Sequence, residues 1–188
     1  MRTEDRDKVL QNPNGLRKVS PVDDKDPTLE TYNRTIKTDA KGNPVERTEF
    51  VSAMFMPSDY RPNERENFPS SGNTSTAYMK NNLDAQPGDE RGHINPNALN
   101  GKPVAYNMAT QPASINRNVG RDPSNDDWYK NEREMIDYIR KGNGFIRYEV
   151  CLEYPNDTSG RPSAYKWTTR YYDTDGAVSR TVSGIARS

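Results

Sequence analysis

The only histidine of this 188-residue chain, His93, lies among strongly polar neighbours. It ends the run Asp89-Glu90-Arg91-Gly92-His93 and precedes a loop rich in asparagine and proline. A histidine of the core would have apolar neighbours, so this pattern predicts an imidazole that solvent can reach. An imidazole titrates near neutral pH, and His93 could therefore accept a proton from water without a large shift of its pKa.

Amide and carboxylate side chains follow His93 at spacings that suit one kind of chemistry. They are Asn107, Gln111, Asn116 and Glu132. A base, an amide oxygen, a carboxylate and an arginine such as Arg91 are the groups that metal-assisted hydrolysis of a phosphodiester needs. A hard cation takes oxygen ligands and polarises the phosphate, and a cationic side chain stabilises the charge that grows on the phosphate oxygens. Asparagine is a mild ligand, so the pattern indicates a Mg²⁺ ion that keeps most of its water.

The composition excludes several other kinds of site. The single cysteine, Cys151, can form no intrachain disulfide, and with one histidine the chain cannot build a Cys/His zinc site. Cys151 alternates with strand neighbours and is predicted to be a small core residue. The net charge of zero differs from the basic footprint of a typical nucleic-acid binder.

The chain is polar for a globular protein. Hydrophobic residues make up 31% of it, charged residues 29%, and the mean hydropathy is −1.13, which predicts one modest core and some poorly ordered chain. No apolar run approaches the roughly 20 residues of a membrane span. The first ten residues have no apolar signal core, so we expect either a cytosolic protein or export without a cleaved signal.

An α+β domain is predicted to position the polar residues. Residues 1–29 are charged and rich in turn residues, which predicts a flexible arm or linker. Residues 30–56 have the pattern of a β-hairpin. Residues 57–88 are rich in proline, serine, asparagine and glycine and predict a long loop. His93 follows this loop.

The second half of the chain predicts a strand, two helices and a second hairpin. A strand is expected over 104–111, and a short helix begins near Pro112 with Thr110 as a candidate cap. A long helix runs from about Asp126 to Lys141. The closing hairpin is predicted from strands over 145–154 and 163–174.

Local signals fix the ends and the buried face of the long helix. Asp126 or Asp127 can cap its start, and Gly142 can end it. Four apolar residues favour one face, and these are Trp128, Met135, Ile136 and Ile139.

The ordered series of polar residues resembles the DNA/RNA non-specific endonucleases of the ββα-metal, or His-Me finger, type. Their motif is Asp-Arg-Gly-His, and this chain has ERGH at 90–93. The family then has an Asn and a Gln, a metal-binding Asn, and a helix with a Glu. This chain has YNMATQ at 106–111, INR at 115–117 and NE at 131–132. The resemblance covers about residues 85–178.

The resemblance implies an antiparallel sheet that carries a ββα-metal active-site motif, with a long packed helix. The nuclease domain would span residues 30–188, with its ββα-metal core over about 85–178. The hairpin over 30–56 is similar to what precedes the motif in nuclease domains at the C-termini of bacterial polymorphic and secretion-system toxins.

The resemblance also implies roles for single residues. His93 would be the general base, Asn116 the direct metal ligand, and Glu132 the holder of a water in the metal's shell. Glu134 is an alternative to Glu132, and Asn118 is an alternative to Asn116.

Further residues would stabilise charge or support the site. Arg91 would contact phosphate or help stabilise the transition state. Asn107 and Gln111 would support the site by hydrogen bonds. Glu90 replaces the family's Asp and adds a methylene, so the role of that Asp could instead belong to Asp89, and we leave it open.

Substrate contacts are expected from Arg117 and Arg121, which follow the predicted metal ligand. An aromatic group on the last predicted strand could stack on bases, or it could divide into one buried and one exposed face. Its members are Tyr165, Trp167, Tyr171 and Tyr172.

The resulting hypothesis is a Mg²⁺-dependent endonuclease, with Mn²⁺ as a substitute, that cuts DNA and also RNA with little sequence preference. In the family's mechanism the metal stabilises the leaving 3′ oxygen, so the products carry 5′-phosphates. The resemblance further implies a secreted or delivered toxin that acts in a target-cell cytoplasm, and a cognate immunity protein that covers the cleft. The competing hypothesis is a non-catalytic protein-binding or structural module with a nuclease-like fold.

Overall fold

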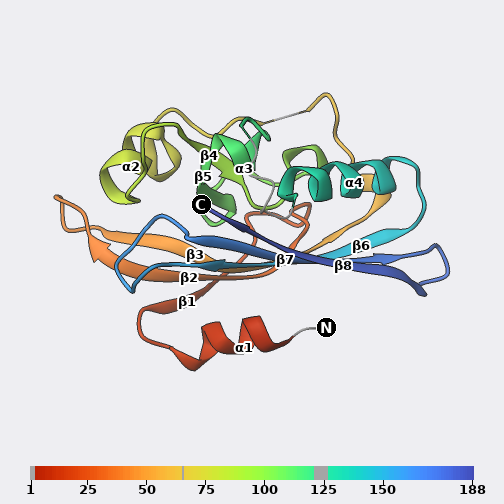
Figure 1. Ribbon diagram of the computed structural model, residues 1–188, viewed down its shortest axis with the longest axis horizontal. Coiled ribbons are helices and arrows are strands. Elements are labelled where there is room, and N and C mark those ends of the chain that lie inside the picture. The colour runs from red at the N-terminus through yellow and green to blue at the C-terminus, as the bar shows by residue number, and fades with distance from the viewer. Residues whose placement is uncertain (1–2, 65, 121–126) are drawn as a thin grey trace.

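An antiparallel sheet is the frame of the molecule. The computed structural model describes residues 3–64, 66–120 and 127–188. Within these ranges six strands pair in the order β1-β2-β3-β6-β7-β8 (Figure 1). Their bounds are Leu16–Val19 for β1, Thr28–Thr38 for β2, Pro44–Phe55 for β3, Phe145–Glu153 for β6, Ala164–Tyr172 for β7 and Val178–Arg187 for β8.

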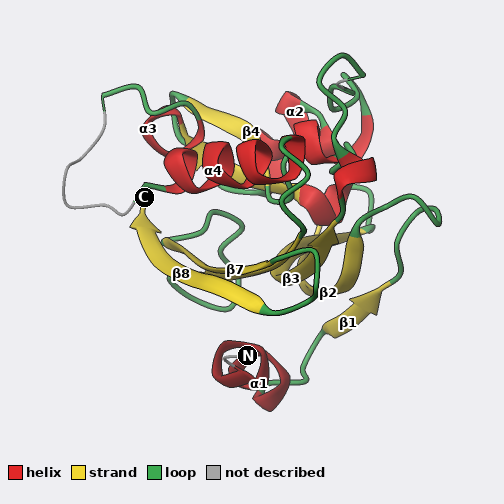
Figure 2. Cartoon of the chain, turned by 90° about the vertical axis from the view of Figure 1, so that its right-hand side faces the viewer, coloured by secondary structure: helices red, strands yellow, loops and turns green. Residues whose placement is uncertain are grey.

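The two faces of this sheet are covered differently. On one side lie the helices α2 (Thr76–Asn82), α3 (Ala113–Asn116) and α4 (Trp128–Arg140), together with a small sheet of β4 (Asp89–His93) and β5 (Met108–Pro112). Figure 2 shows these elements gathered on one side of the large sheet. The helix α1 (Thr3–Gln11) lies on the other side.

The main core forms between the sheet and α4. Strand alternation turns one set of apolar side chains of β3, β6 and β7 toward this helix. Trp128, Met135 and Ile139 of α4 pack into that layer, with Ile136 partly buried beside them. The Asp127 carboxylate accepts the backbone N–H of Lys130 at 2.7 Å, which caps the helix as predicted. Asp126, the second candidate cap, lies outside the described residues.

The predicted hairpins and the long helix are confirmed. The aromatic residues of β7 divide by face, because Tyr165, Trp167 and Tyr171 are buried in the main core. Tyr172 points to the opposite side and stacks on Phe145, with ring centroids 4.5 Å apart. Three of the four rings are therefore core residues and cannot stack on bases.

The described part of the predicted flexible arm, residues 3–29, is ordered against the sheet. Val9 of α1 packs with Tyr32, Phe50 and Cys151 on the far face of the sheet, and β1 extends the sheet beside β2. Cys151 is thus a core residue, as predicted, and burial raises its pKa to about 12. This polar segment forms no core of its own, and its contacts with the sheet hold it in place.

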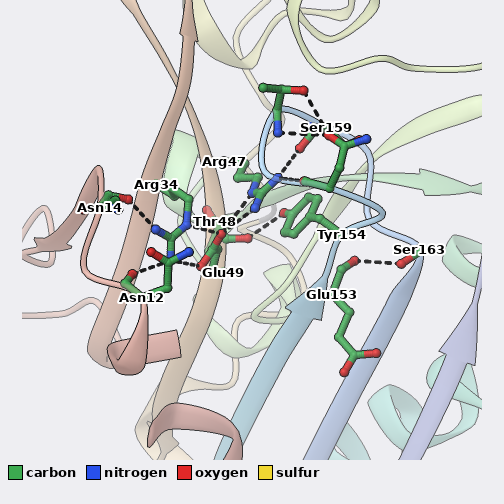
Figure 3. Close-up of polar contacts among 12 residues, drawn as sticks. Asn12, Asn14, Arg34, Arg47, Thr48, Glu49, Glu153, Tyr154, Ser159 and Ser163 are labelled. Carbon is green, nitrogen blue, oxygen red and sulfur yellow. Dashed lines mark hydrogen bonds and ion pairs between the residues drawn. The ribbon is translucent and has the colours of Figure 1, made fainter. Parts of the chain in front are cut away.

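A buried ion-pair cluster ties this segment down. Arg34 and Arg47 both bond to Glu49, and each of the three side chains is less than 10% exposed (Figure 3). The Arg34 guanidinium also donates to the backbone carbonyls of Asn12 and Asn14. These contacts fix the turn between α1 and β1.

Several other elements differ from the sequence-based prediction. The loop predicted over 57–88 contains α2, which Ser75 caps by accepting the N–H of Tyr78. The ERGH motif is itself a strand. The strand predicted over 104–111 begins four residues later, after a 3-10 turn, and Thr110 lies inside it rather than capping α3. The residues after the predicted closing hairpin form β8, which the sequence pattern did not predict.

No helix in the described ranges is long and apolar enough to span a bilayer.

Candidate active site

A cleft of about 860 Å³ lies where β4, α3 and α4 meet. Six of the predicted site residues line it, and these are Glu90, Arg91, His93, Asn116, Arg117 and Glu132. A larger groove of about 1140 Å³ lies between α2 and the β2–β3 hairpin and is lined by none of the predicted residues. The structure therefore brings the predicted chemistry together in the smaller cleft. Arg121 lies outside the described residues.

The glycine of the motif is required by close packing against β5. In the β4–β5 register Gly92 stands opposite Ala109, and the side chain of Gln111 extends over Gly92. A Cβ on Gly92 would come within 2.0 Å of Gln111 Oε1. Gln111 is completely buried, and its amide oxygen and nitrogen have no hydrogen-bond partner among the described residues. Its contribution to the site is the space it fills.

His93 has an apolar neighbour that the sequence does not reveal. Its ring stacks on Phe68, with centroids 4.2 Å apart, and its Nε2 is buried without a hydrogen-bond partner in the described part of the chain. Burial, followed by the charge of Arg91, lowers the pKa of His93 to about 4. The expectations of an imidazole without apolar contacts and with little pKa shift are wrong. At this pKa the ring is neutral at pH 7 and free to accept a proton, and it is a weaker base than a solvated imidazole.

Arg91 holds the segment that covers His93. Its Nη1 donates to the carbonyl oxygens of Phe68, Pro69 and Thr74 at 3.2, 2.9 and 3.2 Å. Its guanidinium carbon lies 5.8 Å from the centre of the Phe68 ring. In this structure Arg91 therefore orients Phe68 over the histidine, which differs from the predicted contact with phosphate.

Glu90 contacts the predicted metal ligand, Asn116. Its carboxylate accepts Asn116 Nδ2 at 2.8 Å and Arg117 Nε at 2.9 Å, and a second Arg117 nitrogen completes the ion pair. Burial raises the pKa of Glu90, but these hydrogen bonds outweigh it and hold the pKa below its usual value. With Nδ2 turned toward Glu90, the amide oxygen of Asn116 remains available as a metal ligand.

Asp89, the neighbour of Glu90 in the motif, lies in a separate ion pair. Its carboxylate binds Arg161, from the connection between β6 and β7, through two hydrogen bonds of 2.6 and 3.0 Å. Its side chain is only 4% exposed, so it anchors β4 rather than contacting Asn116.

Glu134 and Asn118 do not line the cleft. Glu134 pairs with Arg180 of β8 at 3.3 Å and with Lys130 at 4.0 Å. Asn118 is exposed beyond the end of α3, at a left-handed φ of 59°. The geometry therefore supports Glu132 over Glu134 and Asn116 over Asn118.

Asn107 supports the loop that follows His93. Its Oδ1 accepts the backbone N–H of Asn95 at 2.6 Å, and its Nδ2 donates to the carbonyls of Asn95 and Lys102 at 3.1 and 2.9 Å. This is the arrangement that a supporting role requires. The N-terminal segment contributes as well, because Asn95 Nδ2 donates to the Thr28 hydroxyl at 3.0 Å.

The cleft fits a hydrated Mg²⁺ better than a site made of many protein ligands. The described ranges contain no group of three or more His, Cys, Asp or Glu residues that could hold a metal. One amide oxygen from Asn116, with the half-buried Glu132 in the same cleft, suits an ion that keeps several waters. Structural zinc needs four protein ligands and does not fit this donor set.

Phe68, Tyr129 and Arg133 line the cleft and were not among the predicted site residues. Tyr129 and Arg133 lie on the same face of α4 as the predicted residue Glu132, three residues before it and one after it. Helical periodicity along α4 could have found Tyr129 and Arg133. Phe68 gave no signal, because it belongs to a loop with no regular pattern.

Comparisons with known proteins identify the fold. Neither a scan against protein-family models nor a search of curated proteins gave a match. NucA from Streptococcus agalactiae with no metal bound has a TM-score of 0.53 at 16% identity, covering 89% of this chain and 75% of that chain. The same protein with magnesium bound has a TM-score of 0.53 at 15% identity, covering 97% and 88%.

A third structure, the EndoG/EndoGI complex, has a TM-score of 0.55 at 12% identity and covers 100% of this chain and 81% of that chain. Identities this low show a shared fold and no more. The predicted α+β fold is confirmed, with its antiparallel sheet, its β4–β5–α3 motif and its long packed helix.

Proposed function

We propose that the chain is a metal-dependent endonuclease that hydrolyses phosphodiester bonds of DNA, and also of RNA, with little sequence preference. The observation that carries this proposal is the convergence of a neutral His93, an Asn116 amide held by Glu90, and Glu132 in one cleft. This cleft belongs to a fold shared with NucA and EndoG.

The residues of the chain divide the chemistry between them. His93, whose ring is neutral at pH 7, accepts the proton of the attacking water. Asn116 would hold Mg²⁺ through Oδ1, and Glu132 would hold one of the metal's waters. Mg²⁺ bound there would stabilise the negative charge on the phosphate and on the leaving 3′ oxygen, so that products carry 5′-phosphates. The magnesium bound to NucA supports this choice of metal, and Mn²⁺ is the expected substitute.

The direct test is cleavage of supercoiled plasmid by the purified protein, with Mg²⁺ or with EDTA. We expect cleavage only with Mg²⁺ and a loss of about 10²- to 10⁴-fold in His93→Ala, the usual contribution of a general base. Glu132→Ala should lose activity, whereas Glu134→Ala, a carboxylate on the same helix outside the cleft, should not. Circular dichroism shows whether each variant is folded.

A folded wild-type protein that cleaves neither DNA nor RNA would overturn the proposal. The non-catalytic binding module would then be the remaining interpretation, and its signature is the absence of turnover in both wild type and His93→Ala.

The biological setting is a further part of the proposal. We propose that the protein acts as a delivered antibacterial toxin and that an acidic immunity protein covers the His93 cleft. The EndoG/EndoGI complex, whose subject is the inhibition of EndoG, supports the idea that a protein can inhibit an enzyme of this fold. Co-expression with a candidate inhibitor should restore growth of cells that express the active protein and leave His93→Ala cells unaffected.

A further inference from the structure

Two of the three arginines that line the cleft in the described ranges are already engaged. Arg117 is ion-paired with Glu90, so its charge is neutralised. Arg91 donates to three backbone carbonyls. A phosphate would have to displace existing partners of either residue. The predicted substrate contact at Arg117 is therefore not the one that the geometry favours.

Arg133 is in a different situation. Its guanidinium makes one hydrogen bond in the described part of the chain, from Nη1 to the phenolic oxygen of Tyr129 at 3.3 Å, and no described carboxylate lies within ion-pair distance. Asp137, one turn further along the helix, interacts with Arg133 only through its charge, and it forms ion pairs with Arg140 and Lys141 at 2.6 and 2.9 Å. Arg133 therefore lines the cleft without an ion-pair partner of its own among the described residues.

Tyr129 fixes where that charge lies. The two residues are four apart on α4, and the guanidinium carbon of Arg133 lies 5.8 Å from the centre of the Tyr129 ring. Hydrogen bonding and cation–π contact together restrict the arginine to the wall that also carries Glu132. A planar guanidinium of this kind matches the oxygens of a phosphodiester.

We propose that Arg133 binds a backbone phosphate of the nucleic-acid strand next to the one that is cleaved, and that Tyr129 is the positioning residue for its guanidinium. This subsite rests on the proposed nuclease function. It assigns the main phosphate contact of the cleft to the wall formed by α4, with a ligand that is the phosphodiester backbone of either DNA or RNA. Such a contact adds affinity without sequence preference.

The test measures binding in a background without turnover. A fluorescent single-stranded oligonucleotide is titrated with His93→Ala protein at several salt concentrations and followed by anisotropy. Adding Arg133→Ala should weaken binding about 5- to 20-fold and lower the slope of log K against log salt by about 0.7, the value for one phosphate contact on a single strand. Lys130→Ala is the matched control, because it removes one charge from the outer face of the same helix.

Two further variants separate phosphate binding from a structural effect. Arg133→Lys keeps the charge and should restore the salt slope but not the full affinity, because it loses the planar fork. Tyr129→Phe should weaken binding about twofold to fivefold and leave the salt slope unchanged, since a single neutral hydrogen bond is removed.

The possible results separate the two proposals. An Arg133→Ala affinity and salt slope equal to those of Lys130→Ala would overturn the subsite. So would oligonucleotide binding by His93→Ala protein that does not depend on salt. Plasmid cleavage by the wild type tests the nuclease function independently, so a protein that cleaves normally with an inert Arg133 refutes the subsite alone.

Discussion

Two polar regions of the molecule use their charges in opposite ways. In the cluster of Figure 3, Glu49 binds both Arg34 and Arg47, and the two arginines also donate to four backbone carbonyls. In the cleft, His93 Nε2 is buried without a partner among the described residues. Every guanidinium nitrogen of the cluster has a hydrogen-bond partner, whereas His93 Nε2 in the cleft could still bond to water or substrate.

A substitution in the buried ion-pair cluster should cause the largest loss of stability. Glu49→Gln keeps the shape of the side chain but leaves two buried arginines without their carboxylate. We expect it to lower the free energy of unfolding by about 3–5 kcal/mol, as when one partner of a buried ion pair is removed. Denaturant unfolding followed by fluorescence measures this change.

The control is Glu153→Gln, which removes an exposed carboxylate paired with Lys166 and should change the free energy of unfolding by less than about 1 kcal/mol. Equal effects of the two substitutions would show that the ion pairs of Glu49 contribute no more to stability than an exposed ion pair.

The next largest effect is expected where Glu90 holds Asn116, the proposed metal ligand. Glu90→Ala removes the acceptor of Asn116 Nδ2 and should raise the Mg²⁺ concentration needed for half-maximal cleavage about 10- to 100-fold, as for other residues that orient a metal ligand. Glu90→Gln should have a smaller effect, because its amide oxygen still accepts that hydrogen bond. An unchanged Mg²⁺ dependence in Glu90→Ala would mean that Asn116 needs no such support.

A side chain at Gly92 should cause a loss of stability of intermediate size, because Gly92 packs closely against Gln111. Gly92→Ala should cost about 1–3 kcal/mol of stability, because the new methyl group would overlap the Gln111 amide. Gln111→Ala removes the obstacle, so the double variant should recover most of that loss in a double-mutant cycle. Additive losses would indicate that the clash is relieved elsewhere in β4.

Where the sequence predicted the structure, the signal was local. The cap at Asp127 and the apolar spacing from Trp128 to Ile139 are properties of one helix, so α4 could be recognised. The motif placed His93 and Asn116 in one site for the same reason, because the two strands and the short helix are contiguous in sequence.

The errors of prediction arise where contacts between distant segments decide the structure. The order of residues 3–19 depends on Arg34, which reaches back 22 residues to the Asn12 carbonyl. The cover over His93 depends on Phe68, held by Arg91 from 23 residues away. No local pattern encodes either contact, and so the arm and the environment of the imidazole were both predicted wrongly.

The last prediction concerns the pKa of His93, which has the smallest expected effect at neutral pH and can be measured directly. With one histidine in the chain, the imidazole gives a single pair of carbon-bound proton signals, whose shift can be followed by NMR without assignment by mutation. We expect a pKa of about 4 in the metal-free protein, where the ring is desolvated and faces the charge of Arg91. Phe68→Ala admits water to the ring and should move the pKa up toward 6.5.

The same shift links His93 to stability with a definite sign. Between pH 6.5 and 4 the unfolded chain protonates its histidine while the folded protein does not, so the stability contribution of His93 falls as the pH falls through this window. His93→Ala should abolish that part of the pH dependence. Cleavage, which needs the neutral ring, should persist below about pH 6 in the wild type and fail at a higher pH in Phe68→Ala. A measured pKa near 6.5 in the wild type would mean that the imidazole is solvated. Its Nε2 would then already be hydrogen-bonded to water, and the cleft would not differ from the buried cluster in this respect.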